Sequence, residues 1–207
     1  MAISGRVGAV YVTDPATAPV PFTNAATTVD PNSGYTRYQV TNRSWRYWPL
    51  DANITVRRNG NVITTGFELE RPGGYVVFEA PNLATDVITV SGTALTLVQA
   101  AGMFKWSIDL ESDSTETSTF GSSGWKEYLT TARGWSGSAE AYWVTSDLWN
   151  NVLGEIVVVR LAFAANQAFE GFAIIKSEGL ETPVDEIVTQ SLEFDGVDKI
   201  YLHLWEA

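Results

Sequence analysis

Strict alternation of apolar and polar residues marks residues 104–113 as a β-strand. Successive side chains of a strand point to opposite faces, so this segment has one apolar and one polar face. The polar face carries three carboxylates, those of Asp109, Glu111 and Asp113. Two hypotheses fit this pattern: the solvated face of an ordinary antiparallel sheet, or a surface that lines a pore, in which case the three residues face its lumen. The apolar positions are Phe104, Trp106, Ile108 and Leu110.

Shorter apolar or alternating segments predict further strands along most of the chain. Asn59 and Gly60 stand between two of them and predict a tight hairpin, because a type I′ turn needs a positive φ at both central residues. Residues 14–34 carry four prolines and predict a long loop, since proline cannot donate a ladder hydrogen bond. The last two strands are predicted to pair through a turn at Asp195 and Gly196. The predicted strands are residues 5–13, 35–41, 53–58, 62–67, 75–80, 86–90, 93–98, 135–143, 155–164, 168–177, 184–194 and 199–205.

Two short amphipathic helices are also predicted, because apolar residues recur there at the spacing of one helical face. Ser122 or Ser123 would cap the first helix and Gly134 would end it, whereas Ser146 and Gly154 would bound the second. Together the elements predict a mainly β fold, an antiparallel β-sandwich or barrel with one or two short flanking helices. The apolar positions are Trp125, Tyr128, Leu129 and Ala132 in the first helix, and Leu148, Trp149, Val152 and Leu153 in the second.

Length and composition narrow the class of protein. A chain of 207 residues predicts one domain, residues 1–207, with residues 35–98 as a candidate β-rich insertion or extension. The absence of cysteine excludes disulfides, thiolate metal sites and thiol nucleophiles. The first residues lack the pattern of a signal peptide, and no apolar run is long enough to predict a membrane-spanning helix.

The charge balance argues against a nucleic-acid-binding protein. The chain has 13 Lys and Arg residues against 24 Asp and Glu residues, a formal net charge of −11. Binding to polyphosphates depends on cations that neutralise phosphates, so this chain is a poor candidate for it. Solubility explains such a charge, and so does a surface to which passing DNA must not adhere.

No residue constellation in the sequence predicts catalysis. His203 is the only histidine, so a metal site rich in histidine cannot form within one chain. We interpret His203 as a core or interface residue. The carboxylate pairs Asp109–Glu111 and Glu193–Asp195 have a spacing that a glycosidase could use, but such pairs are common in an acidic chain. We therefore expect no enzymatic activity, no cofactor and no metal.

Eight Trp and eight Tyr residues raise the alternative of a carbohydrate-binding β-sandwich module, because exposed aromatic rings stack on sugars. Core packing and subunit contacts use aromatic residues just as often. Trp106 and Trp149 follow the apolar periodicity and are predicted in the core. Trp45 and Trp48 lie in a predicted turn beside arginines, where exposure or a subunit contact is the expectation.

Several segments resemble the phage major tail proteins, also called tail tube proteins. Residues 120–143, FGSSGWKEYLTTARGWSGSAEAYW, are similar to the central segment of such proteins. The order of the matching segments along one chain carries the resemblance, which covers most of the sequence. The other segments are residues 1–11, Arg46-Tyr47-Trp48, the strand pair that ends at Val90-Ser91-Gly92, and residues 191–196.

The resemblance implies a structural protein of the virion tail that assembles in the host cytoplasm. Its subunits would form homo-hexameric rings, stacked into a tube through which DNA passes during ejection without specific binding. Tape-measure, tail-terminator and baseplate proteins would be its partners, and no membrane would be involved. Residues 14–34 and 112–124 would be contact arms. The candidate subunit-contact residues are Trp45, Trp48, Phe120 and Trp125.

Overall fold

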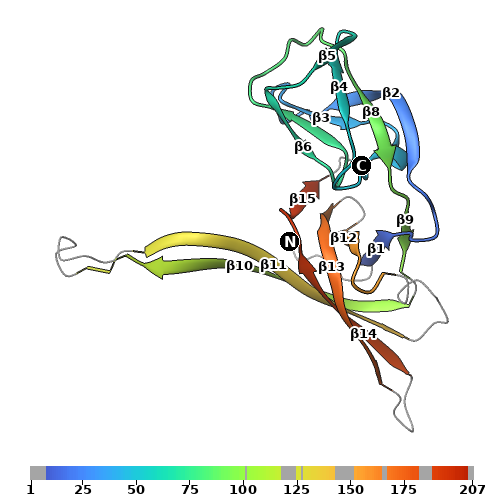
Figure 1. Cartoon of the computed structure of the whole chain (residues 1–207), viewed down its shortest axis with the longest axis vertical. Coiled ribbons are helices and arrows are strands. Elements are labelled where there is room, and N and C mark those ends of the chain that lie inside the picture. The colour runs from blue at the N-terminus through green and yellow to red at the C-terminus, as the bar shows by residue number, and fades with distance from the viewer. Residues whose placement is uncertain are drawn as a thin grey trace.

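The computed structural model describes residues 8–100, 102–117, 125–126, 128–142, 152–164, 167–181 and 188–204. They form a mainly β protein built from two antiparallel sheets (Figure 1). The mainly β, antiparallel fold class is thus confirmed. Within the described residues the only helical element is the 3₁₀ turn η2 (Arg43–Trp45). No helix in this part of the chain has the length and hydropathy needed to span a bilayer.

The first sheet, called here the long-strand sheet, has eight strands in the order β10-β11-β14-β13-β12-β1-β9, with β15 paired to β13. Its residues come from both ends of the sequence, because β1 lies beside strands of the C-terminal half. The predicted pairing of the last two strands is wrong, since both pair with β13 at different positions along it. The strands are β1 (Ala9–Thr13), β9 (Leu97–Gln99), β10 (Met103–Glu116), β11 (Tyr128–Tyr142), β12 (Ile156–Ala164), β13 (Gln167–Glu181), β14 (Thr189–Gly196) and β15 (Tyr201–Leu204).

The second sheet forms what we call the short-strand lobe, residues 20–94. The lobe leaves and rejoins the long-strand sheet at one place, because β1 pairs with β9 and the Asp14 N–H donates to the Thr96 carbonyl at 2.8 Å. That residues 35–98 form a β-rich insertion or extension of the domain stays a prediction. The strand order is β5-β4-β8-β2-β3-β7-β6. The strands are β2 (Val20–Val29), β3 (Arg37–Val40), β4 (Thr55–Arg58), β5 (Asn61–Ile63), β6 (Phe67–Glu70), β7 (Tyr75–Phe78) and β8 (Ile88–Ala94).

Each sheet has a hydrophobic core of its own. In the long-strand sheet the Trp135 ring lies against Gly171 and Gly196, where an added Cβ would meet indole atoms at 2.7 Å and 2.1 Å. Gly137 likewise leaves room for the Phe194 ring. The absence of a side chain at these three glycines therefore lets aromatic rings pack directly on the backbone of the core. The core of the lobe is made of Phe22, Ala25, Tyr38, Val40, Trp48, Val56, Val76, Phe78, Ile88, Val90 and Ala94.

The helix predicted from Trp125 to Ala132 is wrong, because Tyr128 opens strand β11. Its backbone hydrogen bonds go to β10, in a ladder that reaches from Met103↔Ala141 to Glu116↔Tyr128. A helical spacing over only eight residues is a weak signal, and tertiary pairing overrides it. Residues 143–151, which hold most of the second predicted helix, lie outside the described residues. Leu153 at its end makes an isolated bridge to Ile175.

The loop predicted at residues 14–34 is also partly wrong, because it contains β2. Pro21, the second residue of β2, is the only one of the four prolines inside the strand. The strand is then interrupted by a register shift between Phe22 and Ala25. Proline is tolerated near a strand end and beside an irregularity, which explains why the segment forms a ladder despite its composition.

The hairpin predicted at Asn59-Gly60 is confirmed. The two residues have φ values of 51° and 82° and connect β4 to β5. We expect Gly60→Ala to lower the free energy of unfolding by roughly 1 kcal/mol, because an L-residue is strained at this φ although nothing lies within 4 Å of its Cβ position. Urea unfolding measures the change. Gly134→Ala, with equally open space and no positive φ, is the matched control and should change the free energy by less than about 0.5 kcal/mol.

Candidate functional site

The candidate site begins with the polar face of the long-strand sheet. Residues directly opposite each other in adjacent strands share a face, and the register Asp109↔Ser136↔Asp195 crosses β10, β11 and β14. Two residues away, the register Ser107↔Ser138↔Glu193 does the same. The opposite face of these strands carries core residues such as Phe194 and Leu192. Strands β10, β11 and β14 therefore have one mainly apolar face and one face of carboxylates and hydroxyls, which we call the acidic face.

Two lysines and several short polar contacts order the acidic face. Lys105 pairs with Glu140 at 2.5 Å across the β10–β11 ladder, and Lys176 pairs with Asp195. Hydroxyls contribute as well: the side chains of Ser107 and Ser138 lie 2.9 Å apart, and Ser177 donates to Glu193 at 3.1 Å. With the adjoining residues of β13 included, six carboxylates against two lysines leave a net charge of −4. The carboxylates are those of Asp109, Glu111, Glu140, Glu181, Glu193 and Asp195.

The predicted acidic residues are therefore brought together with others that the local pattern did not reveal. Asp109 and Glu111 lie on the acidic face, beside Ser136 and Gly134 of β11. Asp113 falls in a register shift between Ser112 and Ser114, where the alternation is interrupted. Asp109, Glu111 and Asp113 are all exposed. Their assignment to the lumen of a channel stays a prediction.

The second part of the site is a two-stranded ribbon, residues 110–116 and 128–134. β14 supports β11 only from Ser136 to Tyr142, so beyond that point β10 and β11 pair with each other alone. Figure 1 shows the β10–β11 hairpin projecting far from the other strands. Every ribbon side chain whose burial is described is exposed.

The ribbon exposes three large apolar side chains to solvent. Leu110, Tyr128 and Leu129 are 64%, 59% and 61% exposed. A hairpin of two strands is marginally stable alone, and its outer edge offers unpaired N–H and C=O groups. Trp125, a candidate subunit-contact residue, is 80% exposed. Phe120, another candidate, lies outside the described residues.

The other two candidate contact residues belong to the lobe. Trp48 is fully buried in the lobe core, and its indole N–H donates to the Trp45 carbonyl at 2.7 Å. Trp45 is half-buried and stacks on Phe22 with a ring separation of 5.6 Å. The expectation that Trp48 is exposed is therefore wrong, because the turn packs it inward.

A sugar site would need aromatic rings in a hollow, and a metal site would need a cluster of ligand side chains. A hollow of about 570 Å³ lies beside the β4–β5 hairpin, but no aromatic residue lines it. No cluster of three or more His, Asp and Glu side chains in this part of the chain is arranged to hold a metal ion. His203 is buried where the lobe meets the long-strand sheet, in agreement with a core or interface histidine. The lining residues of the hollow are Arg58, Asn59, Asn61, Val62, Ile63, Thr64 and Thr65.

No protein-family model matches the sequence, and no curated protein matches it. Among solved structures, the chain is similar to a chain from the tail of an empty gene transfer agent particle with C6 symmetry, at 15% identity and a TM-score of 0.44, over 51% of this chain and 84% of that one. It is also similar to a chain from the virion of a native gene transfer agent particle, at 15% identity and a TM-score of 0.43, over 51% of this chain and 88% of that one. A likeness this distant assigns no function by itself.

Proposed function

We propose that this chain is a structural protein of a phage tail, the subunit of a tail tube. Its subunits would join into homo-hexameric rings that stack around a channel for DNA, and the role involves no catalysis. The observation that carries the proposal is the projecting two-stranded ribbon, on which Leu110, Tyr128 and Leu129 are exposed among polar residues. The resemblance of residues 120–143 to the central segment of tail tube proteins supports the same assignment.

Assembly would bury the exposed apolar side chains of the ribbon and would cover its free strand edge. A neighbouring subunit would cover Leu110, Tyr128 and Leu129, and removal of apolar surface from water favours association. The free edge of β10 would gain a partner strand or a covering loop. A contact between two different surfaces of identical subunits closes into a ring when the rotation permits it, and stacking then extends the ring into a tube.

The acidic face supplies a suitable lining for the channel. A surface with a net charge of −4, in a chain with a formal charge of −11, repels phosphates, and its two lysines are paired with carboxylates of the same surface. The serine hydroxyls keep this surface hydrated. Carboxylates on every subunit of a ring would repeat around the channel, so passing DNA would meet a uniform surface. Contacts with tape-measure, tail-terminator and baseplate proteins belong to the same proposal.

Carbohydrate binding is the competing function. The large number of aromatic residues in the sequence suggests it. Of the Trp residues that the structure describes, Trp48 and Trp135 are buried, Trp106 and Trp45 are half-buried against cores, and Trp125 is 80% exposed but does not line the hollow beside the β4–β5 hairpin. Stacking on a sugar needs an exposed ring in a hollow, and no aromatic side chain lines the hollow beside the β4–β5 hairpin. The buried aromatic side chains therefore favour the tube subunit.

Size-exclusion chromatography with light scattering, on purified protein over a range of concentrations, separates the two functions. The tube proposal predicts assemblies of six or more subunits of 22.6 kDa and no response of Trp fluorescence to oligosaccharides. A monomer at every concentration, together with a sugar-dependent change in Trp fluorescence, would overturn the proposal in favour of the binding module.

A further inference from the structure

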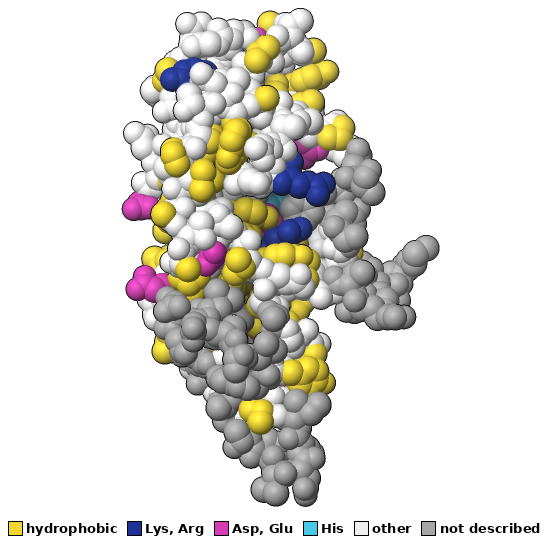
Figure 2. Space-filling model, turned by 90° about the vertical axis from the view of Figure 1, so that its right-hand side faces the viewer, with side chains coloured by type: hydrophobic (Ala, Val, Ile, Leu, Met, Phe, Trp, Pro, Cys, Tyr) yellow, Lys and Arg dark blue, Asp and Glu magenta, His cyan; other side chains and the backbone are white. Residues whose placement is uncertain are grey.

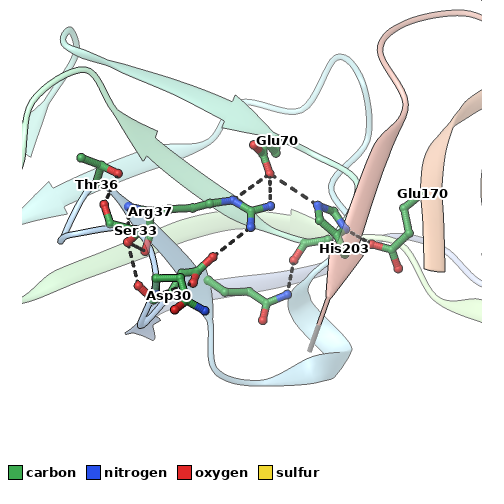
Figure 3. Close-up of polar contacts among 10 residues, drawn as sticks. Asp30, Ser33, Thr36, Arg37, Glu70, Glu170 and His203 are labelled. Atoms are coloured by element: carbon green, nitrogen blue, oxygen red, sulfur yellow. Dashed lines mark hydrogen bonds and ion pairs between the residues drawn. The ribbon is translucent and has the colours of Figure 1, made fainter. Parts of the chain in front are cut away.

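The junction between the short-strand lobe and the long-strand sheet holds a cluster of charged side chains around the chain's single histidine. His203 in β15 lies between Glu170 in β13 and Glu70 in β6, as Figure 3 shows. Glu170 and His203 are 0% exposed, and the side chain of Glu70 is 17% exposed. β13 and β15 belong to the long-strand sheet and β6 to the lobe, so the imidazole bridges the two.

The two carboxylates contact opposite nitrogens of the ring. Nδ1 lies 2.5 Å from Glu170 Oε2, and Nε2 lies 3.4 Å from Glu70 Oε2. A neutral imidazole has one N–H donor and one lone pair, so it would turn a lone pair toward one of these carboxylates. An imidazolium has two donors and serves both. The geometry therefore matches the protonated ring.

The ion pairs around the ring show how much of the cluster depends on it. Asp30 and Glu70 pair with Arg37 at 3.1 Å and 2.5 Å, and Glu170 pairs with Arg160 at 3.2 Å. The guanidinium of Arg46 in the lobe also interacts electrostatically with Glu170. His203 is the one group that contacts both Glu70 and Glu170, which are largely or fully removed from water. Loss of its proton removes a charge-assisted contact from each of these carboxylates, and weakened pairing in such a site is costly.

The ring also lies against uncharged groups of both parts of the chain. Tyr47 of the lobe donates its hydroxyl to Glu170 Oε1 at 2.7 Å. The rings of Tyr75 and Tyr201 have centroids 4.7 Å and 5.9 Å from that of His203. Gly73 of the lobe lies directly on the imidazole, where an added Cβ would be 2.4 Å from Cε1. These contacts exclude water from the ring. Because water does not replace the contacts of the imidazole, the charge on His203 determines how strongly it holds Glu70 and Glu170.

We propose that His203 is a proton-dependent clasp, in which the imidazolium fastens the short-strand lobe to the long-strand sheet through Glu70 and Glu170 and loss of its proton loosens the lobe. In the view of Figure 2, Lys and Arg side chains gather at mid-height, where the lobe and the sheet meet. The clasp does not depend on the function of the assembled protein, because every group in it belongs to one chain.

The titration of these groups sets the pH range of the clasp. Burial lowers the pKa of His203, but hydrogen bonds to Glu170 and Glu70 outweigh it and raise that pKa above 6.5. Burial raises the pKa of Glu70, but hydrogen bonds from His203 and Arg37 outweigh it and bring that pKa below 4.5. The histidine's contribution is thus complete below pH 6.5 and lost as the pH rises through its folded pKa. Glu70's contribution is complete above pH 4.5 and lost as the pH falls through its own.

Hydrogen exchange read by mass spectrometry tests the clasp on the full chain, assembled or not. Deuterium exchange at Cε1 of the single histidine gives its pKa, which should lie above 6.5. Backbone exchange of the turn at residues 71–74 is compared with that of His203→Gln at each pH, which cancels the intrinsic pH dependence. At about pH 5 the variant should exchange at least roughly tenfold faster than the native chain, and the ratio should fall toward one as His203 deprotonates.

Two further variants separate a clasp from a merely structural histidine. Glu70→Gln should lower the pKa of His203 and move the midpoint of the exchange ratio to lower pH with it. Glu68→Gln is the matched control, because Glu68 is 76% exposed and reaches Lys199 across the same junction at 3.9 Å. It should move neither value. A His203 pKa at or below 6.5, or an exchange ratio that does not change with pH, would overturn the proposal.

Discussion

Replacing Glu170 by alanine is expected to lower the free energy of unfolding by roughly 3–5 kcal/mol, because it takes a carboxylate partner from a buried cation. Glu170 is fully buried and contacts His203, Arg160 and Tyr47. Its removal leaves the buried imidazolium without its nearer carboxylate and the partly exposed Arg160 guanidinium without this ion pair, and it leaves the Tyr47 hydroxyl without its acceptor. Urea unfolding of native and variant protein at about pH 6 measures the difference.

The control for this variant is Glu68→Ala at the exposed edge of the same junction. Its carboxylate lies 3.9 Å from Lys199, and both side chains are exposed. An exposed ion pair adds little stability, so the change should stay below about 1 kcal/mol. A loss below about 1 kcal/mol for Glu170→Ala itself would show that the buried cluster does not stabilise the junction.

Replacing both Leu110 and Leu129 by glutamate is expected to have the second large effect, which is on assembly. These side chains are exposed in the free subunit, so the free energy of unfolding should change by less than about 0.5 kcal/mol. In the tube a neighbour would bury them, and two desolvated carboxylates per contact would raise the concentration needed for assembly by roughly 100-fold or more. Light scattering against concentration measures that threshold.

Leu83→Glu provides the matched control for the ribbon variant. Leu83 is 69% exposed, as open as Leu110 and Leu129, but it lies on the short-strand lobe. The substitution has the same chemistry at a site outside the proposed contact, and assembly should proceed at the native threshold. If the ribbon variant assembled as readily as Leu83→Glu, the ribbon would not be the contact between subunits.

Local pattern was sufficient to predict most strands of this fold. The alternation in residues 104–113 placed Asp109 and Glu111 on one strand face, and Asn59-Gly60 marked the turn between β4 and β5. Both signals are local, since they depend on the two-residue period of a strand and on the φ angles of one turn. Elements whose hydrogen bonds come from distant strands were harder to predict. Tyr128 to Ala132 has a helical spacing but forms a ladder with β10.

The charged cluster around His203 could not be predicted from the spacing of residues along the sequence, because its members are far apart in the chain. Glu170 and Glu70 are 33 and 133 residues from His203. One sequence signal was nevertheless present: Arg160 interrupts the otherwise apolar β12, and Glu170 interrupts the apolar stretch from Ala168 to Ile175 of β13. A charged residue in such a strand predicts a buried partner of opposite sign, and these two residues pair with each other.

Electron cryomicroscopy of the purified assembly tests the central claim most directly. The account predicts rings with sixfold symmetry stacked around an open channel. It further predicts that the acidic face, with Asp109 and Glu111, lines that channel while the ribbon lies on a neighbouring subunit. Assemblies without a central channel, or a tube in which the acidic face points outward and the short-strand lobe lines the interior, would contradict it.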